Sequence, residues 1–462
     1  MQDSLSLRAN SVRYAGATAS AVGIQAPTAG VTFLPALMAA IVGEAGPLAF
    51  LLALLAMLLV SYAFIVLAAD FASAGSVFAF NGRALGYGYG FLSAWMLLGV
   101  YIAYSSSIYA SNANFMESLA GAAHVVIAWP VFALLFWALA LLLAYLRISV
   151  STMLIFALES VAIVLVAIVA VAVVLKGGSG GHAVTGAPFT PGRIPVATIG
   201  LGVIFAFTGF SGFEVSATLG EEASRPRRVI PVSMIAALLV SGGIYVVVSW
   251  VETIAYPSAG ALANQSVPLV DIAGRYVTPA MGTMINVAAL ISGIGAQLAT
   301  VNGGNRLLFA LARDGLGPRW LATVHRRQRS PIAALTVVGT VSVVAVTPFM
   351  LIGTSPIDAF FYLATYGADL IIIAYLLTSI AALVWSIRRG HAFGLRVVGL
   401  VAAIAVMAYI IKGTVYPVPA APFDLCIYAA GITIACGVAL LMVPRLRANL
   451  SRSPLLASAA AD

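Results

Sequence analysis

The stretch Gly23-Ile24-Gln25-Ala26-Pro27-Thr28-Ala29-Gly30 lies inside the first long apolar run of the chain. Proline lacks the amide hydrogen that a helix interior needs, and it restricts the backbone of the residue before it. A glycine at each end of the stretch adds conformational freedom. We therefore expect the helix of this run to be interrupted near Pro27.

A second apolar run contains a comparable stretch, Phe207-Thr208-Gly209-Phe210-Ser211-Gly212-Phe213-Glu214. Glycine also eases packing between membrane helices, so one such stretch would be weak evidence of a break. These two stretches, however, fall in the first and the sixth apolar runs, and each begins a block of five. Interrupted segments at matching positions of two halves point to the binding site of a transporter. Free amides at one half-helix end and carbonyls at the other suit a zwitterion.

The composition requires a lipid environment. Apolar residues make up 62% of the 462 residues and charged residues only 8%, whereas soluble proteins carry about 25% charged residues. The net charge of +8 does not indicate nucleic-acid binding, because nearly all the basic residues sit in short loops between apolar runs. The four histidines have no metal-ligand spacing, no phosphate-binding loop is present, and no nucleophile–base pair suggests an enzyme. We expect neither a cofactor nor a metal.

Twelve runs approach the length of about 20 residues that a membrane span needs. They cover residues 14–40, 47–69, 86–112, 125–146, 149–175, 196–220, 230–254, 279–311, 332–353, 357–387, 395–413 and 423–444. With both termini in the cytoplasm, all basic residues except Lys176, Arg193, Arg275 and Lys412 lie on the inside, as the positive-inside rule requires. The sequence predicts an all-α, multi-pass protein of the cytoplasmic membrane, in a bacterium.

Three loop motifs resemble the amino acid–polyamine–organocation superfamily of permeases. They are residues 70–80 (DFASAGSVFAF), residues 212–222 (GFEVSATLGEE) followed by 225–231 (RPRRVIP), and residues 305–331, which include Asn305-Arg306, Ala312-Arg313-Asp314-Gly315, Pro318 and Ser330-Pro331. The first-helix pattern usual in these permeases, Gly-x-Gly-Ile-Phe, is replaced here by the stretch from Gly23 to Gly30. The specificity of the superfamily therefore cannot be transferred.

The resemblance implies one transporter domain over residues 1–444 and a short cytoplasmic tail over 445–462. The domain would contain two inverted five-helix repeats, at 14–175 and 196–387, and two peripheral helices within 395–444. It also implies a cavity lined by helices 1, 3, 6, 8 and 10. The residues predicted to bind the substrate are Gly23, Ile24, Gln25, Ala26, Pro27, Thr28, Tyr101, Tyr104, Phe207, Thr208, Gly209, Phe210, Gly212 and Glu214. The two tyrosines would gate the cavity or simply pack beside it.

Carboxylates inside a membrane are rare and usually functional. Glu159, in the middle of the fifth run, is predicted to carry a coupling proton or to bind Na⁺ together with Thr300 and Asn302. A neutral carboxyl hydrogen-bonded to the eighth helix is the alternative.

Two further carboxylates stand out within the predicted spans. Glu214 would either cap the second half of the sixth helix or pair with a substrate amine. Asp369 shares a helix face with Tyr366, and this pair is predicted to form a gate, a hydrogen-bond cluster or a direct substrate contact.

The function expected from these features is alternating-access transport of amino acids or related amines, with coupling to H⁺ or Na⁺ or with exchange. A polyamine or organic-cation carrier is the nearest alternative. A cation channel would show a filter segment and a membrane enzyme a catalytic cluster, and neither is visible in the sequence.

Overall fold

The computed structural model describes residues 13–71, 76–145, 152–219, 223–325, 331–391, 393–416 and 418–450, and these residues contain helices and no strands. Glu221 and Glu222, which belong to the second motif, lie outside the described residues. The main helices are α1 (Tyr14–Gln25), α2 (Pro27–Val31), α3 (Leu34–Val42), α4 (Gly46–Asp70), α5 (Ser76–Leu85), α6 (Tyr87–Ala122), α7 (Trp129–Tyr145), α8 (Thr152–Leu175), α9 (Val196–Phe207), α10 (Pro226–Ala255), α11 (Ala259–Ala263), α12 (Pro268–Tyr276), α13 (Pro279–Arg313), α14 (Ile332–Leu351), α15 (Pro356–Arg388), α16 (Leu395–Val415), α17 (Phe423–Leu441) and α18 (Pro444–Leu450).

Ten helical stretches in the described residues are long and apolar enough to cross a membrane. The difference from the twelve expected spans arises near the N-terminus and at α7. The first expected span is divided into α1, α2 and α3, and α3 is joined to α4 through a short 3₁₀ turn at Gly43–Ala45. The helix α7 has 17 residues and is shorter than the usual span. The fold is therefore an all-helical membrane bundle with about ten spans of ordinary length.

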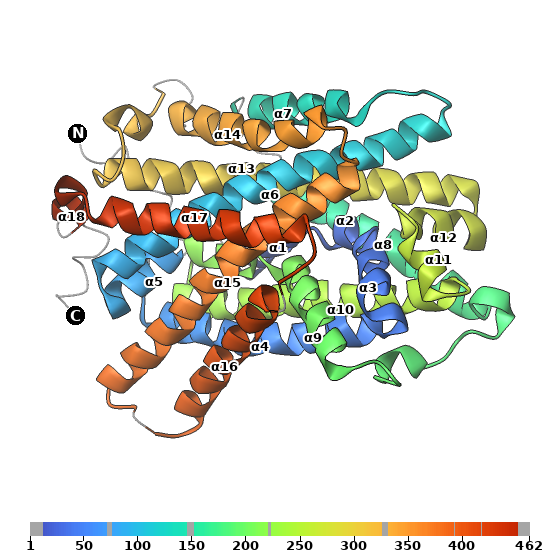
Figure 1. The fold of residues 1–462 in the computed structure, drawn as a ribbon, viewed down its shortest axis with the longest axis horizontal. Helices are drawn as coiled ribbons and strands as arrows, with labels where there is room; N and C mark the ends of the chain where they lie inside the picture. Colours follow the sequence, from blue (N-terminus) through green and yellow to red (C-terminus); the bar gives the residue numbers. More distant parts are fainter. Residues whose placement is uncertain are drawn as a thin grey trace.

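The helices around the centre of the bundle come from distant parts of the chain. The helix α6 packs against α13, α14 and α15, while α10 packs against α1 and α4. At the periphery, α17 lies on α6 and α15, and only Cys426, Ala430 and Gly437 of this helix are buried. In Figure 1, α5 and α18 lie at one end of the molecule, and α11 and α12 lie at the opposite end.

Both predicted helix interruptions are present. The first separates α1 from α2, and the second follows α9, where short 3₁₀ turns at Thr208–Phe210 and Phe213–Leu219 replace the regular helix. Both breaks lie deep in the bundle, since Thr28 and Phe210 are completely buried. A break at this depth is tolerated in a membrane only where protein or a cavity surrounds it.

Candidate solute-binding site

The first break is made by a left-handed residue followed by proline. The helix α1 ends at Gln25, Ala26 adopts φ 40° and ψ 59°, and α2 starts at Pro27. The Ala26 amide still donates to the Val22 carbonyl at 2.9 Å. Proline suits the first position of a helix because no amide hydrogen is left unsatisfied there.

Side chains of the protein already bind the amides that follow Pro27. The Thr28 amide donates to Glu159 Oε1 of α8 at 3.1 Å, and the Ala29 amide donates to Ser292 Oγ of α13 at 3.4 Å. Glu159 is only 4% exposed. A carboxylate is well placed at a helix N-terminus, where the free amides carry partial positive charge. The sequence-based idea that a substrate carboxylate occupies these amides is therefore wrong for this conformation.

The second break requires glycine. Gly212 has φ 104°, and a Cβ atom there would overlap the Ile24 side chain. The Gly212 amide donates to Glu214 Oε2 at 3.1 Å, and the same oxygen accepts a hydrogen bond from the Tyr375 hydroxyl. Glu214 thus caps the second break from within, as Glu159 caps the first break from a neighbouring helix.

Gln25 connects the two breaks. Its Nε2 donates to the Phe210 carbonyl at 3.0 Å, and its Oε1 accepts from Ser241 Oγ of α10 at 2.6 Å. The Tyr245 hydroxyl donates to the Gln25 carbonyl at 3.3 Å, and the Tyr245 ring fills the space beside Gly209. The side-chain amide of Gln25 therefore holds the breaks in register and has little capacity left for a solute.

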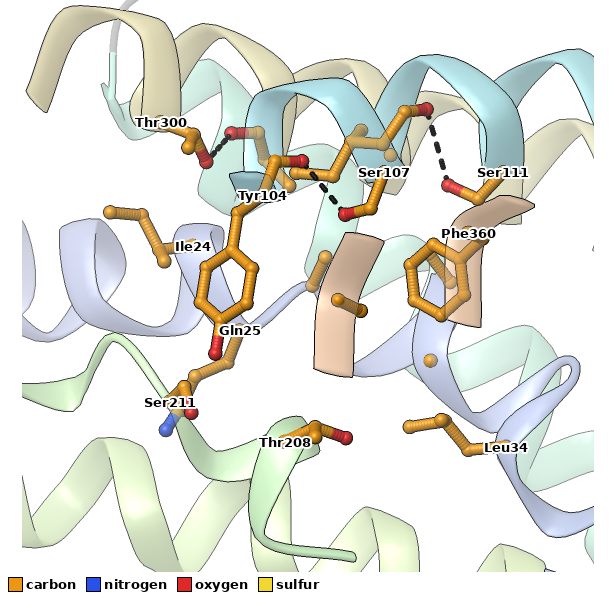
Figure 2. A pocket seen from close by; sticks show the side chains of 18 of the residues that line it. Ile24, Gln25, Leu34, Tyr104, Ser107, Ser111, Thr208, Ser211, Thr300 and Phe360 are labelled. Atoms are coloured by element: carbon orange, nitrogen blue, oxygen red, sulfur yellow. Dashed lines mark hydrogen bonds between the residues drawn. The ribbon is translucent and has the colours of Figure 1, made fainter. Parts of the chain in front are cut away.

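A cavity of about 90 Å³ lies between the breaks (Figure 2). A single water needs about 10–15 Å³. The cavity is therefore larger than one water and suits a small solute. Its polar lining consists only of uncharged groups, namely Gln25, Tyr104, Ser107, Ser111, Thr208, Ser211, Tyr245 and Thr300, and the rest is apolar or glycine. Phe33, Leu34 and Phe360 form an apolar part of its wall.

Tyr104 is the lining residue best placed to meet a bound solute. Its ring extends from α6 across the cavity toward Ser211 (Figure 2). Its buried hydroxyl lies beside Ser211, in a contact that falls short of a regular hydrogen bond. Because buried hydroxyls normally find a good partner, this weakly held group is well suited to turn from Ser211 to a bound solute.

A family model described as amino acid permease matches residues 13–443. The chain belongs to this family. The description of this family and the names of its relatives indicate a permease rather than an enzyme.

Several curated permeases and transporters are similar to parts of the chain. An uncharacterised transporter of Mycobacterium tuberculosis is 37% identical over 139 residues, which are 29% of this chain and 30% of the relative. The branched-chain amino acid permease BcaP of Bacillus subtilis is 30% identical over 41% of this chain and 40% of its own. The low-affinity putrescine importer PlaP of Escherichia coli is 24% identical over 68% of this chain and 69% of its own.

A solved transporter shares the fold. The crystal structure of the Eremococcus coleocola manganese transporter mutant H236A superposes with a TM-score of 0.57 over 95% of this chain and 94% of that chain, at 15% identity. At 15% identity, this similarity shows that the two chains share a fold, and it says nothing about the solute that this chain binds.

The permease structure brings about half of the predicted substrate-binding residues to the cavity. Ile24, Gln25, Ala26, Tyr104, Thr208 and Gly209 line it, whereas Gly23, Pro27, Thr28, Tyr101, Phe207, Phe210, Gly212 and Glu214 do not. Phe207 packs on Tyr375, and Phe210 packs on Tyr245, behind the wall. Tyr101 packs against Gly303 and Gly304 of α13.

The predicted sodium ligands do not come together. Glu159 lies beside Ser292 of α13, and Thr300 follows Ser292 by eight residues, which is about 12 Å along a helix. Thr300 faces the cavity, while Asn302 is exposed. The set Glu159, Thr300 and Asn302 therefore forms no ion site in this structure.

Tyr366 and Asp369, which were predicted to form a gate, do not line the cavity. The Tyr366 hydroxyl pairs with Thr433 Oγ1 of the peripheral helix α17 at 2.8 Å. Asp369 is buried, and its Oδ2 has no hydrogen-bond partner among the described residues, but it does not line the cavity. Residues three apart share a broad helix face, and both α6 and α17 pack against α15.

Sequence reasoning missed several residues at the site. The main ones are Ser107, Ser111, Ser211, Tyr245, Ser292, Phe360 and Tyr375. Ser107 and Ser111 follow Tyr104 at helical spacing, which was a usable signal. Tyr245 and Tyr375 had none, because an isolated tyrosine in an apolar run resembles any packing residue.

Proposed function

We propose that this permease is a secondary transporter of small neutral amino acids that works by alternating access. The observation that supports the proposal is a small cavity at the junction of the two helix breaks whose lining carries no charged side chain. A net-neutral zwitterion needs no counter-charge, whereas a burial site for a net cation would normally offer a carboxylate.

In this proposal the backbone and hydroxyls hold the main-chain groups of the amino acid. The Ile24 carbonyl near the end of α1 suits an ammonium group, because the Thr28 amide that would bond to it in a continuous helix donates to Glu159 instead. The Tyr104 hydroxyl would donate to the carboxylate. Phe33, Leu34 and Phe360 would contact an apolar side chain.

The topology proposed for the chain has twelve spans and an inverted repeat, with both termini in the cytoplasm. The distribution of basic residues supports this orientation, because Arg83, Arg388 and Arg447 belong to α5, to the end of α15 and to α18. In Figure 1, α5 and α18 share one end of the molecule. The two breaks, one in each half, support the repeat.

Glu159 is proposed as the coupling proton site. Its contact with the Thr28 amide places its charge directly on the first break. Gaining or losing a proton there would change how strongly α8 holds α2, which is the element that has to move if access alternates.

An amine carrier is the second candidate. Asp369 offers a buried and unpartnered carboxylate oxygen near Tyr104, and a rotation of Tyr104 would open a path toward it. A solute that lacks a carboxylate would then be bound through Asp369.

Thermal unfolding of the purified protein against a panel of solutes separates these candidates. A ligand at 100 times its Kd raises the free energy of unfolding by about 2.7 kcal/mol. We expect stabilisation by small neutral amino acids and none by putrescine or by the corresponding amines. Stabilisation by amines alone, with loss of that effect in Asp369→Asn, would replace the amino acid proposal by the amine carrier.

A further inference from the structure

A fourth intramembrane carboxylate, which sequence reasoning passed over, lies at the far end of α10. Glu252 is completely buried, and neither of its carboxyl oxygens has a hydrogen-bond partner among the described residues. Ser249, three residues earlier on the same side of the helix, is buried with an unpartnered hydroxyl. That hydroxyl lies against Gly46 at the start of α4, where an added Cβ would be 3.3 Å away.

Among the residues that the structure describes, no neighbouring charge compensates Glu252. The elements α3 and α11 and the first turns of α4 carry no charged side chain. On α12, Asp271 and Arg275 pair with each other at 2.7 Å, while Glu44 and Lys176, in the nearby turn and beyond the end of α8, are exposed. A buried, unpaired carboxylate ion costs several kcal/mol or more. The carboxyl of Glu252 is therefore neutral in this conformation.

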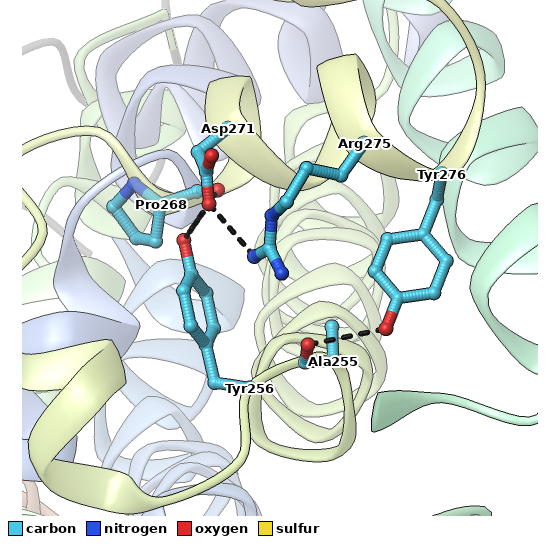
Figure 3. A network of polar contacts seen from close by, with 6 residues as sticks. All are labelled: Ala255, Tyr256, Pro268, Asp271, Arg275 and Tyr276. Carbon is cyan, nitrogen blue, oxygen red and sulfur yellow. Dashed lines mark hydrogen bonds and ion pairs between the residues drawn. The ribbon is translucent and has the colours of Figure 1, made fainter. Parts of the chain in front are cut away.

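A polar network holds α12 over the turn that follows Glu252 (Figure 3). The Tyr256 hydroxyl donates to Asp271 Oδ2 at 2.6 Å, and the Tyr276 hydroxyl donates to the Ala255 carbonyl at 3.2 Å. The guanidinium of Arg275 lies 4.5 Å from the centre of the Tyr256 ring. Burial and the adjacent Asp271 carboxylate raise the pKa of Tyr256 above its ordinary value, so its hydroxyl stays a donor.

The helices α11 and α12 also seal this end with apolar side chains, because Leu262, Leu269 and Ile272 are almost completely buried. In this conformation they keep solvent away from Glu252. If they lifted away, water would reach the carboxyl.

We propose that Glu252 is a second proton-binding site, which holds one proton while α11 and α12 cover it and releases that proton to solvent when they open. This site goes beyond the proposed transport function, since it lies outside the solute cavity and apart from Glu159. Because the closed form binds the proton more tightly, acidic conditions favour closure and alkaline conditions favour opening. One proton shifts the open-to-closed ratio by at most tenfold per pH unit.

Cysteine labelling of purified protein tests this proposal. With Cys426 and Cys436 replaced by serine, Leu262→Cys reports opening because Leu262 is buried, and Ser266→Cys reports the intrinsic pH dependence of a thiol because Ser266 is exposed. The ratio of the two maleimide labelling rates should rise between about pH 6 and pH 8, by up to tenfold per unit. In Glu252→Gln the ratio should not depend on pH, and solute binding should be retained.

The matched control is Glu44→Gln, which changes an exposed carboxylate near the same end and should keep the pH dependence of the parent. A flat ratio in the parent, or an unchanged slope in Glu252→Gln, would overturn the proposal. So would a ratio that follows the replacement of Na⁺ by choline instead of pH, because the site would then bind a metal cation. None of these outcomes depends on which solute the cavity takes.

Discussion

At the scale of single residues, a few side chains decide whether the cavity exists and what enters it. Gly212 adopts a backbone conformation that L-residues avoid, and it leaves room for Ile24. Tyr104 lines the cavity with a hydroxyl that Ser211 holds only weakly. Gly212 therefore shapes the second break, and Tyr104 provides a hydrogen-bonding group for the solute.

Replacing Gly212 by alanine should destabilise the protein and disturb the cavity. The left-handed conformation alone costs about 1–2 kcal/mol for an L-residue, and the overlap with Ile24 adds to this cost. The apparent unfolding temperature should fall. As a control, Gly243→Ala in α10, where a Cβ meets no other atom, should leave this temperature unchanged or slightly higher. Equal temperatures for the two variants would contradict the account of the break.

The variant Tyr104→Phe should weaken amino acid binding about tenfold, because one hydrogen bond to a charged group is lost. Its stability should remain close to that of the parent, since the hydroxyl makes only a weak contact with Ser211. The control is Tyr109→Phe on the same helix, because the Tyr109 hydroxyl is buried without a hydrogen-bond partner among the described residues and does not line the cavity. Equilibrium binding of a radiolabelled amino acid measures both, and an unchanged affinity in Tyr104→Phe would remove this hydroxyl from the site.

At the scale of elements, the half-helix α2 depends on helices that are distant in sequence. The carboxylate of Glu159 on α8 and the hydroxyl of Ser292 on α13 satisfy its first amides. Gln25, at the end of α1, joins the second break to α10. The breaks are therefore held by side chains of their neighbours, and a change in one of these bonds affects a whole element.

Neutralising Glu159 tests the coupling between α8 and α2. In Glu159→Gln the amide oxygen can still accept from Thr28, so the fold should persist, but no proton can be gained or lost. Uptake driven by a pH gradient in proteoliposomes should be lost, while exchange of internal for external solute continues. Glu117→Gln, at an exposed position of α6, should preserve both activities. Retained pH-driven uptake in Glu159→Gln would exclude Glu159 as the proton site.

At the scale of the whole molecule, the proposed function depends on opposite faces of the bundle facing opposite sides of the membrane. The helices α5 and α18 mark one face, and α11 and α12 mark the other (Figure 1). The cavity and both breaks lie between these faces, as alternating access requires.

Sided labelling tests the proposed orientation. In a variant without native cysteines, Ile352→Cys, after the end of α14, should react with a membrane-impermeant maleimide in intact cells. Arg445→Cys in α18 should react only after the membrane is permeabilised. Both positions are exposed, so a difference in labelling reflects the side of the membrane and not burial. The reverse pattern would invert the topology.

The sequence by itself determined the membrane environment, the helical class, the two breaks and the permease family. Each of these depends on local features: apolar runs that need lipid, Pro27 and Gly212 that restrict or free the backbone, and short motifs of fixed spacing. Only the tertiary structure decided which polar groups face the cavity and which serve the fold. It assigned Gln25 and Glu159 to contacts with the opposite break and with α2, turned Tyr366 toward α17, and placed Tyr245 between the breaks. The physical reason is that these roles depend on helix rotation and on partners far away along the chain, and a single sequence does not specify either until the helices pack.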